Sequence, residues 1–143
     1  NFKWLMKKEI RRVPFVGTAC AVAGHIFVDR SNPRAALQSM EKVKKELVDG
    51  ISTVIFPEGT RTKTGEIGRF KQGAFKIAMD MELPVVPITL NGFYKAMPSG
   101  QPFANPFSHL SLHIGKPIDI SQFIDINDAM LHVREKVEHG IVK

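Results

Sequence analysis

The sequence predicts an α/β fold in which a mostly parallel central sheet is covered by helices. Short runs of β-branched and aromatic residues alternate with longer segments whose apolar residues recur at helical spacing. That alternation is typical of a sheet with helices on its faces. The 143 residues are 43% hydrophobic and 24% charged, which is ordinary for a globular protein and sufficient for a core. We therefore expect residues 1–143 to form a single domain.

The first part of the chain predicts a strand, a short helix and a second strand. Residues 2–6 (FKWLM) are apolar and short, and the basic residues 7–12 begin a helix that Pro14 limits. The alternative is one amphipathic basic helix over residues 2–13, of the kind that lies on anionic membranes. Residues 24–30 (GHIFVDR) predict the second strand.

A long helix and the central strand follow. Asn32 and Pro33 suit the N-cap and the first helical position, and Gly50 suits the C-terminal end. Apolar residues recur at helical spacing between them. Residues 53–56 (TVIF) favour a buried strand, which Pro57 ends because proline has no N–H to donate to a ladder.

Two further helices and two further strands are expected in the second half of the chain. Residues 72–81 and 127–139 show helical apolar periodicity. Residues 83–90 (LPVVPITL) predict a strand whose two prolines favour a sheet edge or a bent end. Residues 109–114 alternate between polar and apolar, as a half-buried strand does.

The segment between these two strands, residues 91–107, is rich in proline and glycine and also carries large apolar side chains. They are Phe93, Tyr94, Met97, Phe103 and Phe107. If exposed, they would line a groove for an acyl chain or touch a membrane. The alternative is that they pack beneath the loop.

Charge and cysteine content limit the classes of function. The net charge of +6 favours an anionic partner, such as a lipid headgroup, a phosphorylated small molecule, an acidic carrier protein or nucleic acid. The single cysteine, Cys20, excludes an internal disulfide, and its apolar neighbours predict a buried, inert thiol. No signal peptide is visible, and the longest charge-free apolar run, residues 13–28, is shorter than the about 20 residues of a spanning helix.

A polar loop after the central strand is the strongest candidate for a site. Arg61 offers a planar fork of donors suited to a phosphate, and Gly59 allows backbone N–H groups to approach an anion. Glu58 would orient Arg61 or accept a hydrogen bond from a substrate hydroxyl, and Lys71 adds a second positive charge. The alternative is a solvated loop with an ordinary surface ion pair.

Other constellations are absent from the sequence. A phosphate-binding P-loop needs a second glycine where Thr64 stands. One cysteine and five dispersed histidines predict no metal site, and no G-x-S-x-G segment or RNA-binding fingerprint occurs. We expect no metal, no cofactor and no nucleic-acid partner.

Four segments carry a family resemblance. They are GHIFVDR (24–30), VIFPEGTRT (54–62), RFKQGAF (69–75) and LPVVPITL (83–90). In this order they resemble the motif blocks of the glycerophospholipid acyltransferase family, especially its 1-acylglycerol-3-phosphate acyltransferases. The similarity runs from about residue 3 to about residue 118, and the FPEGTR segment followed by FK-x-G is its most specific part.

The resemblance implies an acceptor site and a pair of substrates. Glu58, Gly59, Thr60 and Arg61 would bind the phosphate and glycerol of lysophosphatidate or glycerol 3-phosphate. Arg30 and Lys71 are weaker candidates for further contacts with the anion. Residues 83–90 would shape the acyl pocket, or their prolines would be purely structural. The acyl donor would be acyl-CoA or acyl carrier protein.

The general base of the family, a His-x4-Asp block, does not occur in this sequence. We expect it upstream, in a longer protein, and expect the chain by itself to be inactive. His25 and Asp29 are no substitute, because on a strand they would lie about 13 Å apart at about 3.3 Å per residue. His25 is predicted to be a packed strand histidine.

The resemblance also implies a membrane-associated protein at the cytoplasmic face, with the membrane surface as a partner. A second hypothesis keeps the loop but not the chemistry. It describes a non-catalytic module that binds anionic lipid.

Overall fold

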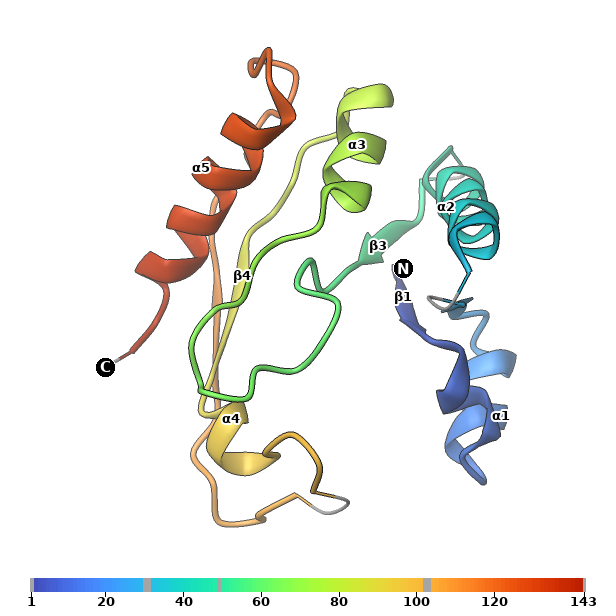
Figure 1. The fold of residues 1–143 in the computed structure, drawn as a ribbon, viewed down its shortest axis with the longest axis vertical. Helices are drawn as coiled ribbons and strands as arrows, with labels where there is room; N and C mark the ends of the chain where they lie inside the picture. Colours follow the sequence, from blue (N-terminus) through green and yellow to red (C-terminus); the bar gives the residue numbers. More distant parts are fainter. Residues whose placement is uncertain (1, 30–31, 49, 102–103, 143) are drawn as a thin grey trace. The chain divides into compact units, whose positions relative to one another are not determined.

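A computed structural model describes residues 2–29, 32–48, 50–101 and 104–142. These residues form two compact units, one within residues 1–56 and the other within residues 57–143. The single domain expected from the sequence stays a prediction. The mixed α/β class is confirmed (Figure 1).

The first unit contains a three-stranded parallel sheet. Its strands are β1 (Phe2–Lys7), β2 (Ile26–Val28) and β3 (Ser52–Val54), in the order β2-β1-β3. Both outer strands run parallel to β1, with Leu5 opposite Ile26 in one ladder. The long helix α2 (Pro33–Val48) packs against β2 and β3. Its C-terminal end is as predicted, because Gly50 has a φ of 74°.

Two short helical segments lie between β1 and β2. They are the 3-10 helix η1 (Lys8–Arg12) and the α-helix α1 (Val16–Val22). The alternative of a continuous basic helix over residues 2–13 is wrong, because residues 2–7 pair with strands on both sides. The helix α1 was not predicted, and Cys20 within it is half-buried rather than buried.

The predicted central strand is shorter than expected. It ends at Val54, and residues 53–55 are half-buried while Phe56 is exposed. Phe56 instead stacks on Trp4, with 5.8 Å between the ring centroids. Local β propensity therefore identified the strand but overestimated its length and burial.

The second unit is built around helices α3 (Gln72–Asp80) and α5 (Ile126–His139), which lie side by side (Figure 1). Both were predicted. Between and beside them is a buried cluster consisting of Phe70, Phe75, Ala78, Ile118, Ile120, Ala129 and Val133. At the start of α5, the side chain of Asp125 accepts a hydrogen bond from the backbone N–H of Asn127 at 3.1 Å.

A two-stranded antiparallel sheet joins β4 (Ile88–Asn91) and β5 (Ser111–Ile114). The strand predicted over residues 83–90 is reduced to its last part, with Val85 in a single bridge to Ile118. The prolines explain this, since neither can donate to a ladder. The short helix α4 (Phe93–Ala96) was not predicted.

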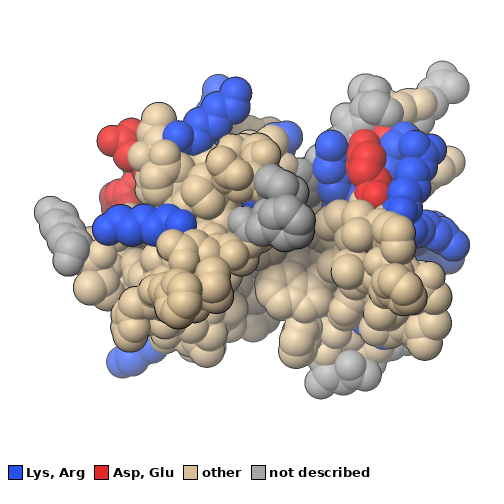
Figure 2. All heavy atoms as spheres, turned by 90° about the horizontal axis from the view of Figure 1, so that it is seen from below, with Lys and Arg blue, Asp and Glu red and all other residues tan. Residues whose placement is uncertain are grey.

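Large apolar side chains are exposed in both units. In the segment between β4 and β5, Phe93, Tyr94, Met97 and Phe107 are exposed, so packing beneath the loop is wrong for these four; Phe103 lies outside the described residues. Figure 2 shows a face on which most of the surface belongs to residues other than Lys, Arg, Asp and Glu. Among the described helices, none has a stretch both long and apolar enough to cross a bilayer.

Candidate anion-binding site

The loop of residues 57–71, called here the acceptor loop, is closed at its base. The backbone N–H of Lys71 donates to the carbonyl of Pro57 at 2.8 Å. Next to this bond Phe70 is buried and stacks on Phe75, with 6.1 Å between the ring centroids. The sequence folds this way because an apolar residue at the end of a polar loop can enter the core and fix both ends of the loop.

Glu58 holds the inside of the acceptor loop. Its Oε2 atom accepts a hydrogen bond from the backbone N–H of Gly68 at 2.6 Å. A Cβ atom at Gly68 would lie 2.8 Å from the same oxygen, so glycine leaves room for this contact. The structure thus gives the Glu58 carboxylate a backbone partner on the opposite side of the loop. The two roles predicted for it, orienting Arg61 or accepting from a substrate hydroxyl, stay predictions.

A second set of hydrogen bonds reaches the loop from α5. Arg134 donates from Nη1 to the carbonyl of Gly68 at 3.1 Å and from Nη2 to the carbonyl of Ile67 at 3.0 Å. Its Nε atom donates to Glu138 at 2.7 Å, which fixes the plane of the guanidinium. No local pattern in the sequence predicts this contact, because Arg134 and Gly68 are 66 positions apart.

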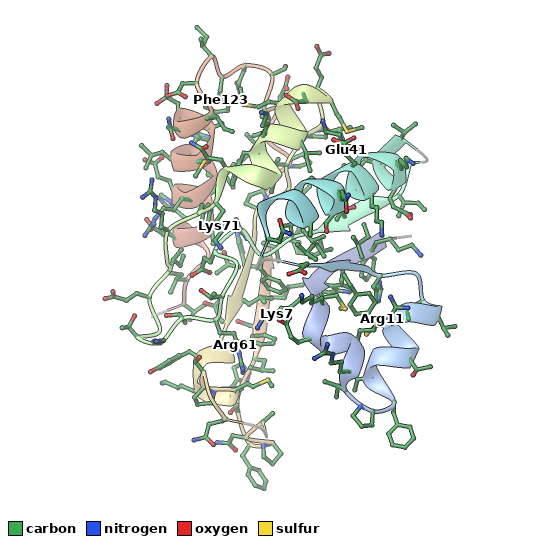
Figure 3. All side chains as sticks on the ribbon, turned by 45° about the vertical axis from the view of Figure 1, so that its right-hand side comes forward. Lys7, Arg11, Glu41, Arg61, Lys71 and Phe123 are labelled. Atoms are coloured by element: carbon green, nitrogen blue, oxygen red, sulfur yellow. The ribbon has the colours of Figure 1, made fainter. Side chains whose placement is uncertain are left out.

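Arg61 lies next to α4 (Figure 3). Two residues before it, Gly59 has a φ of 76°, a left-handed conformation that favours glycine. The Arg61 side chain is exposed, and its Nη1 atom is 3.5 Å from the carbonyl of Pro98. A bond of that length is weak, so the guanidinium keeps most of its donors for an incoming anion. Thr60 is exposed next to it.

An open hollow of about 420 Å³ lies beside the acceptor loop, and we call it the loop hollow. It is lined by Lys63, Tyr94, Pro98, Ser99 and Gly100. Arg61 does not line it, but its Nη1 atom reaches the carbonyl of Pro98, which does. The hydroxyl of Tyr94 donates to the carbonyl of Lys63 at 3.0 Å, which ties the loop to α4. The hydroxyl proton of Tyr94 is used in that bond, which leaves the Lys63 ammonium and the Ser99 hydroxyl as donors that a phosphate group accepts from.

Sequence reasoning identified Arg61 but did not assign Lys63, Tyr94 or Ser99 to the site. The signal for Lys63 was its position two residues after Arg61. No local signal connects Tyr94 and Ser99 to the loop, because the chain between them and Lys63 includes a helix and a strand.

The other candidate residues lie elsewhere or are not described. Lys71 is exposed at the base of the loop, near the start of α3 (Figure 3). Arg30 lies outside the described residues. His25 accepts a hydrogen bond from the backbone N–H of Trp4 at 3.4 Å, and Asp29 forms an ion pair with Lys8 at 2.5 Å. His25 was predicted to be a packed strand histidine, but it is half-buried and lies one residue before β2. That it forms no dyad with Asp29 stays a prediction.

The site therefore has the donors of an anion-binding loop: an exposed guanidinium, an ammonium nearby, and a backbone held in place from two sides. These are the groups from which a phosphate accepts charge-assisted hydrogen bonds.

Comparison with known proteins specifies the class further. The sequence model of the Acyltransferase family matches residues 1–91, and the chain belongs to that family. It is 34% identical over 139 residues to the chloroplastic 1-acyl-sn-glycerol-3-phosphate acyltransferase LPAT1 of Arabidopsis thaliana, covering 96% of this chain and 39% of that protein. It is 42% identical over 88 residues to the 1-acyl-sn-glycerol-3-phosphate acyltransferase of Pseudomonas aeruginosa, covering 61% of this chain and 34% of that protein.

The fold has a counterpart of the same class. The crystal structure of the 1-acyl-sn-glycerophosphate acyltransferase PlsC from Thermotoga maritima superimposes with a TM-score of 0.79 at 25% sequence identity. The match covers 97% of this chain and 55% of that one. The family resemblance in the sequence is thereby confirmed, and the chain spans less than two thirds of the length of each of these relatives.

Proposed function

We propose that this chain supplies the acceptor-binding part of an enzyme that acylates 1-acylglycerol 3-phosphate and produces phosphatidate. The acyl donor is acyl-CoA or acyl carrier protein, and glycerol 3-phosphate is the second candidate acceptor. In this proposal Arg61 and Lys63 bind the phosphate, while Thr60 and Glu58 lie toward the glycerol. Arg30 and Lys71 remain candidates for further contacts with the anion.

The reaction needs one base and no covalent intermediate on the enzyme. A histidine of a His-x4-Asp block, from outside this sequence, takes the proton of the free glycerol hydroxyl. The hydroxyl oxygen then forms an ester bond with the thioester carbonyl carbon, the C–S bond breaks, and the proton passes to the departing thiolate. The residues of this chain contribute by binding and orienting the acceptor, which converts the encounter into a reaction between fixed groups.

One observation carries the proposal. Arg61 is exposed, and its Nη1 atom reaches the carbonyl of Pro98, which lines the loop hollow, in a loop that is closed at its base and hydrogen-bonded to α5. Such a guanidinium needs little reorganisation to bind a phosphate, and preorganisation is the main source of affinity in small sites. The names of the relatives, which act on 1-acyl-sn-glycerol 3-phosphate, support the same substrate.

The alternative is a non-catalytic module that binds anionic lipid through the same loop. The exposed apolar side chains of α4 and the segment after it suit a lipid under both hypotheses and do not separate them. A His-x4-Asp block in the parent protein would decide for the enzyme.

The test is Arg61→Ala in the full-length protein, with both substrates varied. We expect the KM for the phosphorylated acceptor to rise about ten- to hundred-fold, because a charge-assisted hydrogen bond contributes about 1.5–3 kcal/mol. The KM for the thioester should stay within about two-fold. The matched control is Lys76→Ala, which removes one positive charge from an exposed position on α3. Equal effects on both substrates, or an equal loss in the control, would show that Arg61 does not bind the phosphate.

A further inference from the structure

We propose that residues 8–23, which form a hairpin of η1 and α1, rest on an anionic lipid surface. In this arrangement Phe15 and Val22 enter the apolar part of the membrane interface, and Arg11 and Arg12 lie at the headgroups. The inference concerns the first unit and is independent of the acceptor loop.

The first observation is the exposure of the hairpin's apolar side chains. Phe15 is 89% exposed and Val22 83% exposed, and Val13 and Val16 are exposed as well. Ala19 and Val22 lie three positions apart in α1 and therefore share one side of the helix, and Phe15 directly precedes it. From Val13 to Gly24 the chain carries no charged residue. An apolar surface of this kind is uncommon on a protein that meets only water.

The backbone of the hairpin keeps Phe15 at the turn. Phe15 has a φ of 61°, a conformation that is rare and unfavourable for a bulky residue. Just after the turn, α1 approaches η1 so closely that a Cβ atom at Gly17 would lie 2.2 Å from the carbonyl oxygen of Arg11. The tight crossing leaves the phenyl ring outside the hairpin, where no protein side chain of the first unit covers it.

The second observation is the charge around this apolar surface. Residues 2–28 include five lysines and arginines and one acidic residue, Glu9. Lys7 pairs with Glu9 at 3.6 Å, whereas Arg12 is exposed. The guanidinium of Arg11 lies 5.8 Å from the centre of the Phe27 ring, which leaves its edge open to an anion. Cations beside an apolar helix are the pattern of interfacial membrane binding.

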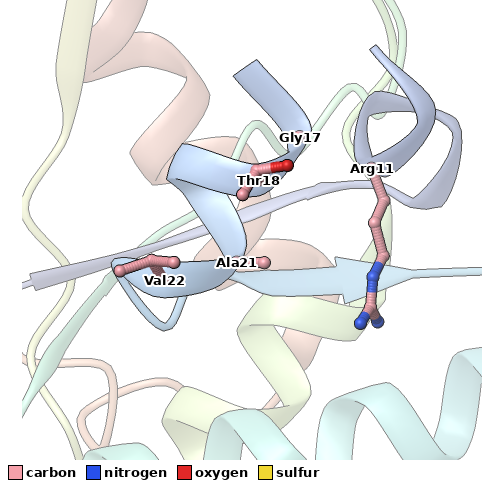
Figure 4. Close-up of a pocket in the computed structure, with 5 residues that line it drawn as sticks. All are labelled: Arg11, Gly17, Thr18, Ala21 and Val22. Atoms are coloured by element: carbon pink, nitrogen blue, oxygen red, sulfur yellow. The ribbon is translucent and has the colours of Figure 1, made fainter. Parts of the chain in front are cut away.

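A hollow of about 390 Å³ between η1 and α1 is lined by both charged and apolar side chains (Figure 4). It is lined by Arg11, Gly17, Thr18, Ala21 and Val22. A guanidinium and a hydroxyl face one part of it, and small apolar side chains face the rest. A phospholipid has complementary groups: a phosphate for the guanidinium and the hydroxyl, and acyl chains for the apolar side chains.

The length of α1 determines how the hairpin meets the membrane. Seven residues extend about 10 Å at 1.5 Å per residue, which is far less than the hydrocarbon core. The hairpin therefore lies within the interface and does not cross it. Nucleic acid is a poorer occupant, because it would leave Phe15 and the valines in water.

The experiment measures binding of the full-length protein to vesicles of phosphatidylcholine with and without phosphatidylglycerol, by cosedimentation and without substrates. Phe15→Gly should weaken binding about ten- to hundred-fold, the contribution of one buried phenyl group. Its melting temperature should not fall, because glycine adopts the positive φ of residue 15 without cost. Val22→Ser tests the same side of α1 without changing the turn, and should weaken binding to a smaller extent.

Charge is tested separately. The pair Arg11→Gln and Arg12→Gln should reduce binding to the anionic vesicles by about five-fold per charge, and leave binding to phosphatidylcholine unchanged. The matched control is Ile124→Ser, which removes a fully exposed isoleucine of the second unit, outside the loop between β4 and β5. Unchanged binding of Phe15→Gly would overturn the proposal. So would an equal loss in Ile124→Ser, or a Phe15→Gly defect in association with another protein and none on vesicles.

Failure of this inference is distinguishable from failure of the proposed function. Arg61→Ala should leave vesicle binding intact, while Phe15→Gly should leave the KM for a water-soluble, short-chain acceptor intact.

Discussion

Replacing Glu58 by alanine should loosen the acceptor loop at one defined point, the backbone N–H of Gly68. That N–H donates to Oε2 of Glu58 at 2.6 Å, a short bond to a charged acceptor. Bonds of this kind contribute about 1.5–3 kcal/mol. Glu58 is half-buried, so water weakens the interaction, and we expect a loss of about 1–2 kcal/mol. That free energy corresponds to a factor of about 5–30 in the population of the open loop.

The assay is residue-resolved amide hydrogen exchange under conditions where the loop opens and closes faster than it exchanges. The Gly68 amide should exchange about 5–30 times faster in Glu58→Ala than in the wild type. Glu58→Gln keeps a neutral acceptor and should show about half the effect in free energy. The control is Glu66→Ala, which removes an exposed carboxylate from the same loop. Exchange at Gly68 that is the same in Glu58→Ala and the wild type would refute the role given to Glu58, as would equal acceleration in the control.

Two further substitutions test how the second unit is held together. Arg134→Ala removes two hydrogen bonds to backbone carbonyls of the acceptor loop, so limited proteolysis should cut that loop several-fold faster; Lys136→Ala, at an exposed position of the same helix, should not change the rate. Gly92→Ala places a Cβ atom 2.1 Å from a backbone oxygen at a φ of 81°, and should lower the free energy of unfolding by more than about 3 kcal/mol. The control is Gly100→Ala, at a similar φ of 90° but with no neighbouring atom within 4 Å. Chemical denaturation should show a loss of only about 1–3 kcal/mol in this variant, which is the cost of the positive φ. An equal loss in both variants would contradict the steric clash proposed for Gly92→Ala.

The long elements were predictable from the sequence because they satisfy local rules that the core reinforces. The helices α2, α3 and α5 have apolar residues at helical spacing, and each buries at least one of them: Val43 in α2, Phe75 in α3 and Val133 in α5. Gly50 ended α2 as expected, because the left-handed conformation after a helix favours glycine.

The short elements were not predictable in the same way. The four residues of α4 and the seven of α1 give too few turns for a periodic pattern to emerge. The length of the strand predicted over residues 83–90 was overestimated, because its β-branched residues favour a strand throughout. In the structure the two prolines lack the N–H groups needed for pairing, and the strand is shorter.

The candidate site was predictable at the level of residues but not of contacts. The FPEGTR segment identified Glu58 and Arg61 by composition and by family resemblance. Their partners in the structure are Gly68 and Pro98, a backbone N–H and a carbonyl, and these depend on how the loop closes. Backbone partners are invisible to motif reasoning, because every residue offers the same groups.

The hydrogen bonds from Arg134 show that the acceptor loop is held by a part of the chain outside the segment that identifies the family. The family match ends at residue 91, yet α5 lies beyond it. A shortened protein that stopped there would keep every motif letter and lose two of the bonds that fix residues 67 and 68. Similarity of these motifs between distant relatives therefore indicates common ancestry. The rigidity of the acceptor loop depends in addition on α5, which lies outside the motifs.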